Sequence, residues 1–303
     1  MADTVGGLMG ELALPAAYAQ IVDTVHRPIA ARLAQVHARL DRPMVVGVCG
    51  SQASGKTTLS AFLQLLLRQA GLTAQTLALD DLYLSRPARE ALAKRVHPLF
   101  VTRGPPGTHD VALGQAVLDV LTGVRPADGL AMPRFDKAAD TLAALRTWPP
   151  LEGPVDVVLF EGWCVGARPQ DPAALDQPVN GLERDRDPRG VWRRYANDRL
   201  AGDYAELFGR LDLLLMMKAP SFRAVFDWRA LQERKLGDRL RAEGGLTGGR
   251  RLMDDDGLRL FLAHYQRLTE HILAEMPARA DVVVRLTDGH AVDRLGFRGR
   301  AMM

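Results

Sequence analysis

Residues 50–57 read Gly-Ser-Gln-Ala-Ser-Gly-Lys-Thr, and this stretch decides the fold. It follows an apolar run at 44–49 and precedes a segment of helical pattern at 58–69. A strand, a glycine-containing loop and a helix in this order turn backbone N–H groups toward one point, which predicts a phosphate-binding loop. Lys56 adds a cation, and Thr57 adds a hydroxyl that can reach magnesium. The alternative, a glycine turn with a surface lysine, is disfavoured because the chain has only five lysines.

The loop therefore predicts that the chain binds a nucleoside triphosphate. The residues expected to contact its phosphates are Gly50, Ser51, Gln52, Ala53, Ser54, Gly55, Lys56, Thr57 and Thr58.

The composition is that of an ordinary globular chain. Its 303 residues are 47% hydrophobic and 25% charged, and we expect one large domain with insertions rather than two small domains. The net charge is only +3 and acids are interleaved with arginines, so we expect no nucleic-acid partner. Cys49 and Cys164 are too few for a disulfide framework, which favours buried thiols and a cytoplasmic location. We expect no signal peptide and no membrane partner, because a basic start and a run of 18 apolar residues are both lacking.

Short apolar runs alternate with helical patterns, which predicts an α/β fold. The five expected strands are 44–49, 74–79, 155–160, 211–217 and 281–286. The expected helices are 16–40, 58–69, 111–121, 224–240 and 255–276. We therefore predict the P-loop NTPase fold, with a five-stranded, mainly parallel sheet, helices on both faces, and inserted substrate and lid segments. The expected divisions are a helical extension at 1–40, a kinase-type domain at 41–290 and a tail at 291–303.

Two connections, 83–154 and 162–210, are too long for simple crossovers, so we expect substrate specificity to reside in them. The second contains a mixed-charge run at 183–189, Glu-Arg-Asp-Arg-Asp-Pro-Arg. Such a run is typical of a solvated, flexible loop.

Acidic residues follow two of the expected strands. Asp80 and Asp81 come after the second strand, and Glu161 comes after the third. Ligands gather at the carboxyl ends of parallel strands, where a carboxylate can accept a proton from a hydroxyl or hold magnesium. The alternatives are a turn or helix cap for the aspartates, and a simple strand end for Glu161.

Two later segments mix rigid turn formers with charged side chains, namely 103–110 and 132–137. Both could present cations and hydrogen-bond donors to a small anionic substrate. Two residues have alternatives: Asp110 could cap the helix that begins at Val111, and His109 could be a structural histidine.

Arginines recur at helical spacing after the fourth strand, at Arg223, Arg229 and Arg234. A basic helix of this kind could close over the phosphates as a lid. The alternative is surface charge, neutralised locally by Asp227 and Glu233.

Taken together, these residues resemble a known family. The shared motifs are 50–57, 79–83 (Leu-Asp-Asp-Leu-Tyr), 103–110 (Arg-Gly-Pro-Pro-Gly-Thr-His-Asp), 135–137 (Phe-Asp-Lys), 158–163 (Val-Leu-Phe-Glu-Gly-Trp) and 228–233 (Trp-Arg, then Gln-Glu). In this order, over roughly 40–290, the chain resembles the D-glycerate 3-kinases of plant and cyanobacterial type and their bacterial and fungal relatives. That family is grouped with uridine kinase, pantothenate kinase and phosphoribulokinase among the P-loop kinases.

The resemblance implies a role for each matching position. Asp80 would be the base for the attacking hydroxyl, with Asp81 as the alternative base. Lys56 and Arg229 would also be catalytic, and Thr57 and Glu161 would hold Mg²⁺. The residues implied on the acceptor side are Asp81, Tyr83, Arg103, His109, Asp110, Arg134 and Lys137.

One segment departs from the family pattern. The family follows its Asp-Lys motif with a segment rich in glycine and arginine, whereas residues 138–146 here read Ala-Ala-Asp-Thr-Leu-Ala-Ala-Leu-Arg. A carboxylate substrate favours a bidentate arginine, and Arg103, Arg134 and Arg146 are all candidates.

We therefore expect an ATP- and Mg²⁺-dependent kinase that phosphorylates a hydroxyl of a small metabolite, with D-glycerate as the leading acceptor. The alternatives are a uridine, pantothenate or sugar kinase, and a non-catalytic ATP-binding regulatory protein. A GTP-dependent switch is disfavoured, because the fourth strand is followed by Lys218-Ala219-Pro220 and not by a guanine-binding Asn-Lys-x-Asp motif. The oligomeric state stays open.

Overall fold

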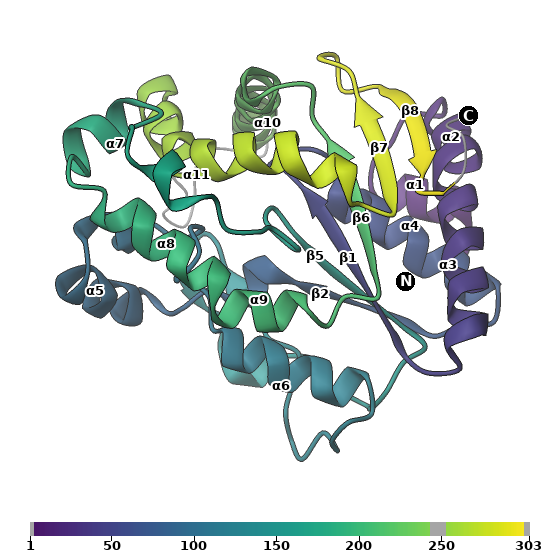
Figure 1. Ribbon diagram of the computed structural model, residues 1–303. Coiled ribbons are helices and arrows are strands. Elements are labelled where there is room, and N and C mark those ends of the chain that lie inside the picture. Colours follow the sequence, from purple (N-terminus) through teal and green to yellow (C-terminus); the bar gives the residue numbers. More distant parts are fainter. Residues whose placement is uncertain (1–2, 243–252, 300–303) are drawn as a thin grey trace.

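A six-stranded sheet forms the middle layer of the molecule (Figure 1). The computed structural model describes residues 3–242 and 253–299. The strands of the sheet are β1 (Met44–Gly50), β2 (Ala74–Ala78), β5 (Val157–Gly162), β6 (Leu213–Lys218), β7 (Val282–Leu286) and β8 (Val292–Phe297). Their spatial order is β2-β5-β1-β6-β7-β8. A separate hairpin pairs β3 (Phe135–Asp136) with β4 (Thr141–Leu142).

The first five strands of this order are parallel, as predicted. The sheet has one strand more than the five predicted: β8, which lies within the residues expected from the sequence to form a tail. This strand pairs with β7 in the antiparallel direction. As an edge strand it reads Val-Asp-Arg-Leu-Gly-Phe and has only one buried residue, so it lacks the apolar run that revealed the other strands.

Helices cover both faces of the sheet (Figure 1). The α-helices are α1 (Val5–Glu11), α2 (Tyr18–Ile21), α3 (Arg27–Leu40), α4 (Lys56–Gln69), α5 (Arg86–Arg95), α6 (Val111–Leu121), α7 (Gly181–Arg186), α8 (Val191–Ala201), α9 (Asp203–Phe208), α10 (Phe222–Ala242) and α11 (Asp255–Glu275). The shorter helical segments are a π-helix, η1 (Val22–His26), and the 3₁₀ turns η2 (Leu79–Leu82), η3 (Pro98–Val101), η4 (Leu145–Thr147), η5 (Pro172–Leu175) and η6 (Met276–Ala278).

Side chains along β1 alternate between two hydrophobic clusters. Val45 and Cys49 pack with residues of α6, α9 and α11, whereas Val46 and Val48 pack with residues of α3, α4 and α10. All seven residues of β1 are buried, as expected for a central strand of a parallel sheet covered on both faces. The carboxyl end of β1 therefore opens onto the loop at 50–57, between two helical layers.

The amino-terminal segment packs against this core. The single helix expected at 16–40 is instead a succession of α2, η1 and α3, and α1 precedes them. His26, at the end of η1, is 3% exposed and packs against the rings of Tyr18 and Phe62, which stack on each other. The wider π-turn ends at His26, and Pro28, which has no backbone N–H, lies in the first turn of α3.

This burial predicts loss of stability in mild acid. Burial lowers the pKa of His26 from 6.5 to about 4, so the folded state holds the ring neutral while the unfolded chain binds a proton below about pH 6.5. The free energy of unfolding should therefore fall by about 1.4 kcal/mol per pH unit between pH 6.5 and the folded pKa, on account of this residue. Urea unfolding at pH 7 and pH 5 measures the slope, and a His26→Phe variant should show a smaller one. An unchanged slope in that variant would contradict the assignment.

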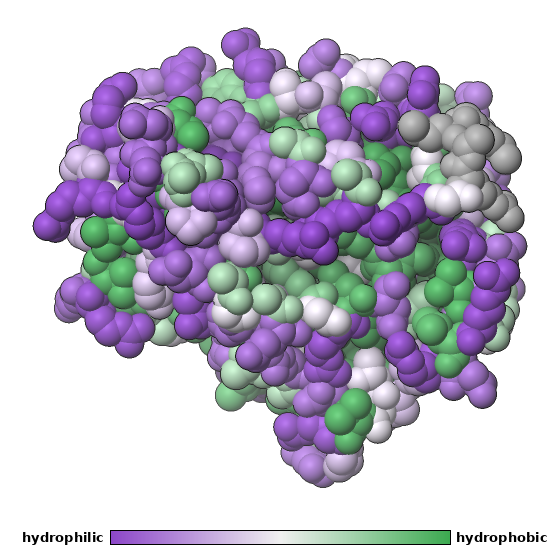
Figure 2. Space-filling model, viewed as in Figure 1, coloured by the Kyte–Doolittle hydropathy of each residue, from purple (hydrophilic) through white to green (hydrophobic). Residues whose placement is uncertain are grey.

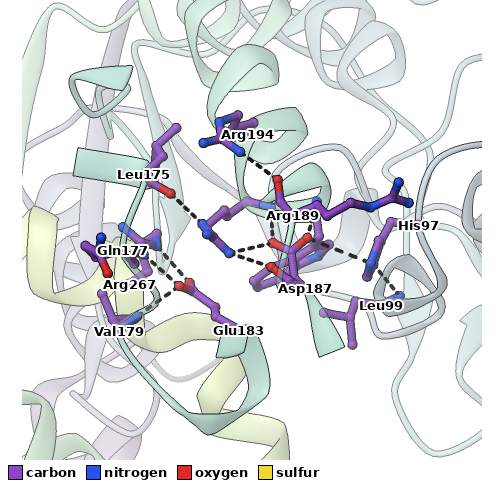
Figure 3. Close-up of polar contacts among 12 residues, drawn as sticks. His97, Leu99, Leu175, Gln177, Val179, Glu183, Asp187, Arg189, Arg194 and Arg267 are labelled. Carbon is purple, nitrogen blue, oxygen red and sulfur yellow. Dashed lines mark hydrogen bonds and ion pairs between the residues drawn. The ribbon is translucent and has the colours of Figure 1, made fainter. Parts of the chain in front are cut away.

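The segment at 183–189, expected to be a solvated flexible loop, contains two buried ion pairs (Figure 3). Glu183 and Asp187 are 0% and 1% exposed. Glu183 accepts hydrogen bonds from Nε and Nη2 of Arg267, at 2.7 and 2.6 Å. Asp187 pairs with Nη1 of Arg193 at 3.1 Å. For these residues the prediction was wrong.

The helical period explains the correction. Glu183 and Asp187 are four residues apart and so lie on one side of α7, facing α8 and α11. Arg184 and Asp185, between them, are 68% and 60% exposed in their side chains. An alternating charge pattern in the sequence does not indicate which of its charged residues will form an ion pair with a residue distant in the chain.

Hydrophilic residues cover most of the face seen in Figure 2, and hydrophobic ones are interspersed among them. Within 3–242 and 253–299, none of the helices combines the length and the apolar character that a membrane crossing requires.

Candidate functional site

The loop at 50–57 joins β1 to α4 in a tightly folded conformation. Ala53 and Gly55 both have positive φ angles, of 59° and 92°. A Cβ atom on Gly50 would lie 2.5 Å from Oγ of Ser54, so any larger residue would displace this serine side chain. Three side chains of the loop place a buried oxygen that has no partner among the described residues: Ser51, Gln52 and Ser54. The loop is thus a folded cradle with free polar atoms.

The cradle leads directly into a helix N-terminus. Lys56, Thr57 and Thr58 form the first turn of α4, and no acid lies in that turn. Free N–H groups and the positive end of the helix dipole favour an anion at this point. The predicted phosphate contacts are therefore contiguous in space.

Thr57 and Glu161 meet at the carboxyl ends of β1 and β5. Oγ1 of Thr57 donates to Oε1 of Glu161 at 2.8 Å. Glu161 is 5% exposed, and its Oε2 is buried without a partner in the described part of the chain. Mg²⁺ usually keeps several waters and binds through one or two carboxylates plus substrate phosphates. The hydroxyl and the free carboxylate oxygen fit such an ion, and no group of three or more His, Cys, Asp or Glu side chains in the described ranges forms an all-protein metal site.

Asp80 lies in η2, just after β2. Its carboxylate accepts hydrogen bonds from the hydroxyl of Tyr83 at 2.8 Å and from Nζ of Lys137 at 2.6 Å. Burial opposes its ionisation, but the positive charges of Lys137 and Lys56 outweigh burial and hold the pKa of Asp80 well below its ordinary value. Asp80 is therefore ionised at neutral pH, and its negative charge is stabilised by Lys56 of the phosphate-binding loop and by Lys137.

Asp81 has a different place from Asp80. Its Oδ1 accepts the backbone N–H of Phe135 at 3.0 Å, and its Oδ2 faces Nη1 of Arg134 at 3.3 Å. Burial raises the pKa of Asp81 above the ordinary value, although these partners oppose the rise. Asp81 thus anchors the β3–β4 hairpin to η2. Direct contact of Asp81 or Arg134 with a substrate stays a prediction.

His109 is a buried neutral histidine. It is 3% exposed, and burial lowers its pKa from 6.5 to about 3. Its Nδ1 lies 2.6 Å from the hydroxyl of Tyr204, which itself accepts the N–H of Gly107 at 2.9 Å. The ring stacks on Tyr83 with centroids 4.7 Å apart, and Nε2 is buried without a partner among the described residues. His109 therefore supports the tyrosine that binds Asp80.

Three site residues carry no sequence signal that we recognised: Arg89, Asp140 and Tyr204. Asp140 pairs with Nη2 of Arg89 at 2.8 Å and also with Arg103, and the two guanidinium groups hold its pKa below the ordinary value against the effect of burial. Arg103 lies over the ring of Phe135, 5.7 Å from the centroid. Asp140 falls within the segment that departs from the family pattern, and this departure was the only available signal.

Two of the predicted residues have side-chain partners outside this group. Oδ1 of Asp110 accepts the N–H of Leu113 at 2.9 Å, so Asp110 is the N-cap of α6. Arg229, on α10, pairs with Glu233 at 2.6 Å, and Glu233 also accepts the N–H of Met253 at 3.0 Å. The capping alternative for Asp110 therefore holds, and a catalytic role for Arg229 stays a prediction.

Known kinases are similar to this chain in sequence. No family model matches the chain. A chloroplastic D-glycerate 3-kinase of Arabidopsis thaliana is 29% identical over 247 residues, which cover 79% of this chain and 50% of that protein. The chain thus spans about half the length of the plant relative. An uncharacterized kinase of Schizosaccharomyces pombe is 31% identical over 236 residues, covering 74% of this chain and 79% of that kinase.

Solved structures show the same fold. The D-glycerate 3-kinase of Cryptococcus neoformans superposes with a TM-score of 0.72 at 23% identity, over 90% of this chain and 99% of that chain. With its phosphate-binding loop, post-strand carboxylates and parallel sheet, the chain belongs to the family of P-loop kinases that includes the plant D-glycerate 3-kinase and its fungal relatives.

Proposed function

We propose that this kinase transfers the γ-phosphoryl group of ATP, with Mg²⁺, to the 3-hydroxyl of D-glycerate. The observation that carries the proposal is the position of Asp80, an ionised carboxylate whose pKa is lowered by both Lys56 and Lys137. Lys56 belongs to the phosphate-binding loop, and Lys137 belongs to the hairpin that β3 and β4 form. A carboxylate between the phosphate side and the acceptor side suits the attacking hydroxyl.

The proposed chemistry is a direct transfer. The acceptor oxygen attacks the γ-phosphorus, the bond from that phosphorus to the β–γ bridging oxygen breaks, and ADP leaves. The acceptor hydroxyl donates a hydrogen bond to Asp80 and passes its proton there late in the reaction, because a low-pKa carboxylate is a weak base. Lys56 and the first turn of α4 bind phosphate oxygens, and Thr57 and Glu161 would hold the Mg²⁺, which neutralises phosphate charge when bound.

We assign the acceptor's carboxylate to Arg103. Its guanidinium lies over Phe135, whose ring meets that of Tyr83 edge-on at 5.2 Å, and Tyr83 binds Asp80. Arg134 is held by Asp81, and Arg146 lies on the exposed side of the η4 turn. Arg103 is already paired with Asp140, so a substrate carboxylate would share or replace that partner.

The Arg103 assignment predicts a selective change in acceptor affinity. An Arg103→Ala variant should raise the KM for D-glycerate by about 10- to 100-fold, the range for losing a charge-assisted hydrogen bond, with a smaller change in kcat. Arg146→Ala is the matched control and should change neither constant. Steady-state kinetics with D-glycerate and with uncharged glycerol distinguish the causes. Equal losses for both acceptors would contradict a role in binding the carboxylate.

An acceptor screen tests the proposed function as a whole. Purified protein is given ATP and Mg²⁺ with D-glycerate, uridine, pantothenate or ribulose 5-phosphate, and ADP release is measured. We expect turnover with D-glycerate well above the others. Turnover with another acceptor alone would show that this compound, and not D-glycerate, is the substrate. No ADP release with any of the four, from protein that still binds ATP, would favour a regulatory protein.

We also propose a reducing compartment such as the cytoplasm, because Cys49 and Cys164 are buried free thiols.

A further inference from the structure

The turn between β7 and β8 touches the phosphate-binding loop. Nε2 of His290, in this turn, lies 2.6 Å from the backbone oxygen of Ala53. A carbonyl oxygen can only accept, so Nε2 carries a proton and donates it to this bond. The imidazole also borders Gly55, where an added Cβ atom would lie 3.9 Å from Cε1 of His290. The histidine therefore covers the middle of the loop from outside.

Both ends of this hydrogen bond have unusual backbone conformations. Ala53 has φ of 59° and His290 has φ of 66°, in the left-handed region that is uncommon for residues other than glycine, although histidine adopts it more readily than alanine does. Such conformations persist only where surrounding contacts hold them, and they gather at functional sites. The His290 bond fixes the peptide group that follows Ala53, and with it the path of the loop between Gly50 and Gly55.

A second contact ties the same histidine to α10. The ring of His290 meets Trp228 edge-to-face, with centroids 4.7 Å apart and planes at 82°. The indole N–H of Trp228 donates to the backbone oxygen of Asp288, two residues before His290, at 2.7 Å. Trp228 is 6% exposed and precedes Arg229 in the helix. The turn at 287–291 is thus held from α10 and in turn holds the loop.

We propose that His290 is a positioning residue for the phosphate-binding loop, which it holds in its binding conformation through the carbonyl of Ala53. Trp228 braces His290, so the conformation of the loop depends on α10 as well as on β1 and α4. The inference depends on one part of the proposed function, namely that the loop binds the phosphate chain of a nucleotide. It is independent of the acceptor.

Binding of inorganic tripolyphosphate tests this role, because that probe has no base or sugar. Titration calorimetry compares tripolyphosphate and ADP in the unmodified protein and in His290→Ala and His290→Gln variants. We expect His290→Ala to weaken both ligands by a similar factor of about ten, and His290→Gln, whose amide can donate to Ala53, to restore most of the loss. His37→Ala, which removes a histidine paired with Asp156 on another part of the surface, is the control and should bind normally.

Several outcomes would overturn the proposal. Unchanged tripolyphosphate binding in His290→Ala would do so, and if ADP alone weakened, His290 would be a base or sugar contact. Thermal melts show whether His290→Ala fails to fold. If it does, His290→Gln alone decides: near-normal tripolyphosphate binding supports the proposal, and a large loss contradicts it. Trp228→Phe combined with His290→Ala should weaken binding by less than the product of the single effects, and strict additivity would remove the link to α10. Absence of D-glycerate turnover with these binding results intact would refute only the proposed acceptor.

Discussion

An Asp80→Asn variant is expected to lose turnover by about 10²- to 10⁴-fold, the usual effect of removing a positioned proton acceptor. The amide keeps the size of the side chain and can still accept from Tyr83, but it has neither negative charge nor basicity. Asp80 is ionised well below neutral pH, so protonation of this residue should produce no loss of activity between pH 5 and pH 8. The loss in the variant should therefore be of similar size across that range.

The measurement is kcat and KM for both substrates, with nucleotide affinity determined separately by titration. ADP affinity should change little, because the phosphate contacts lie in the loop and in α4. Asp81→Asn is the matched control: it weakens the anchor to Phe135 and Arg134 and should lower thermal stability more than kcat. Full turnover in Asp80→Asn with unchanged nucleotide affinity would remove Asp80 as the base.

A Glu183→Ala variant is expected to lower the free energy of unfolding by about 3–5 kcal/mol, the range for breaking a buried ion pair from one side. Glu183 is fully buried and also accepts the N–H of Val179 at 3.0 Å. Its removal leaves Arg267, which is 8% exposed, with only the carbonyl oxygens of Ala174 and Gln177 as hydrogen-bond partners. An unpaired charge in such surroundings strongly favours the unfolded chain.

Urea unfolding of both proteins measures this difference. Asp185→Ala is the matched control, because its ion pair with Arg184 is solvent-exposed and should contribute less than about 1 kcal/mol. Similar small losses in the two variants would contradict the buried network as a major source of stability in the α7–α11 region.

The features that the sequence predicted well are local. The phosphate-binding loop is a continuous motif, and the central strands β1, β5 and β6 are apolar runs because both of their faces are buried. The helix expected at 111–121 is α6, with the same ends, since Asp110 caps it and its apolar residues recur at helical spacing. In each case the signal and the structure involve the same few residues.

The features that the sequence did not predict depend on partners distant in the chain. Asp140 meets Arg89 across 51 positions, and Tyr204 meets His109 across 95. Residue type alone does not indicate such pairings, because an aspartate or tyrosine has many possible partners until the topology selects one. For the same reason Glu183 was expected in solvent. The edge strand β8 was missed because a half-exposed strand needs no apolar run.

The most direct test of the account is product formation from D-glycerate. Purified protein is incubated with ATP, Mg²⁺ and D-glycerate, and the phosphorylated product is identified by ³¹P NMR and mass, with Lys56→Ala as the inactive control. The account predicts 3-phosphoglycerate in stoichiometric amount with ADP, and almost none from Lys56→Ala, which lacks the cation of the phosphate loop. Absence of phosphoglycerate from folded, nucleotide-binding protein, or equal product from Lys56→Ala, would contradict it.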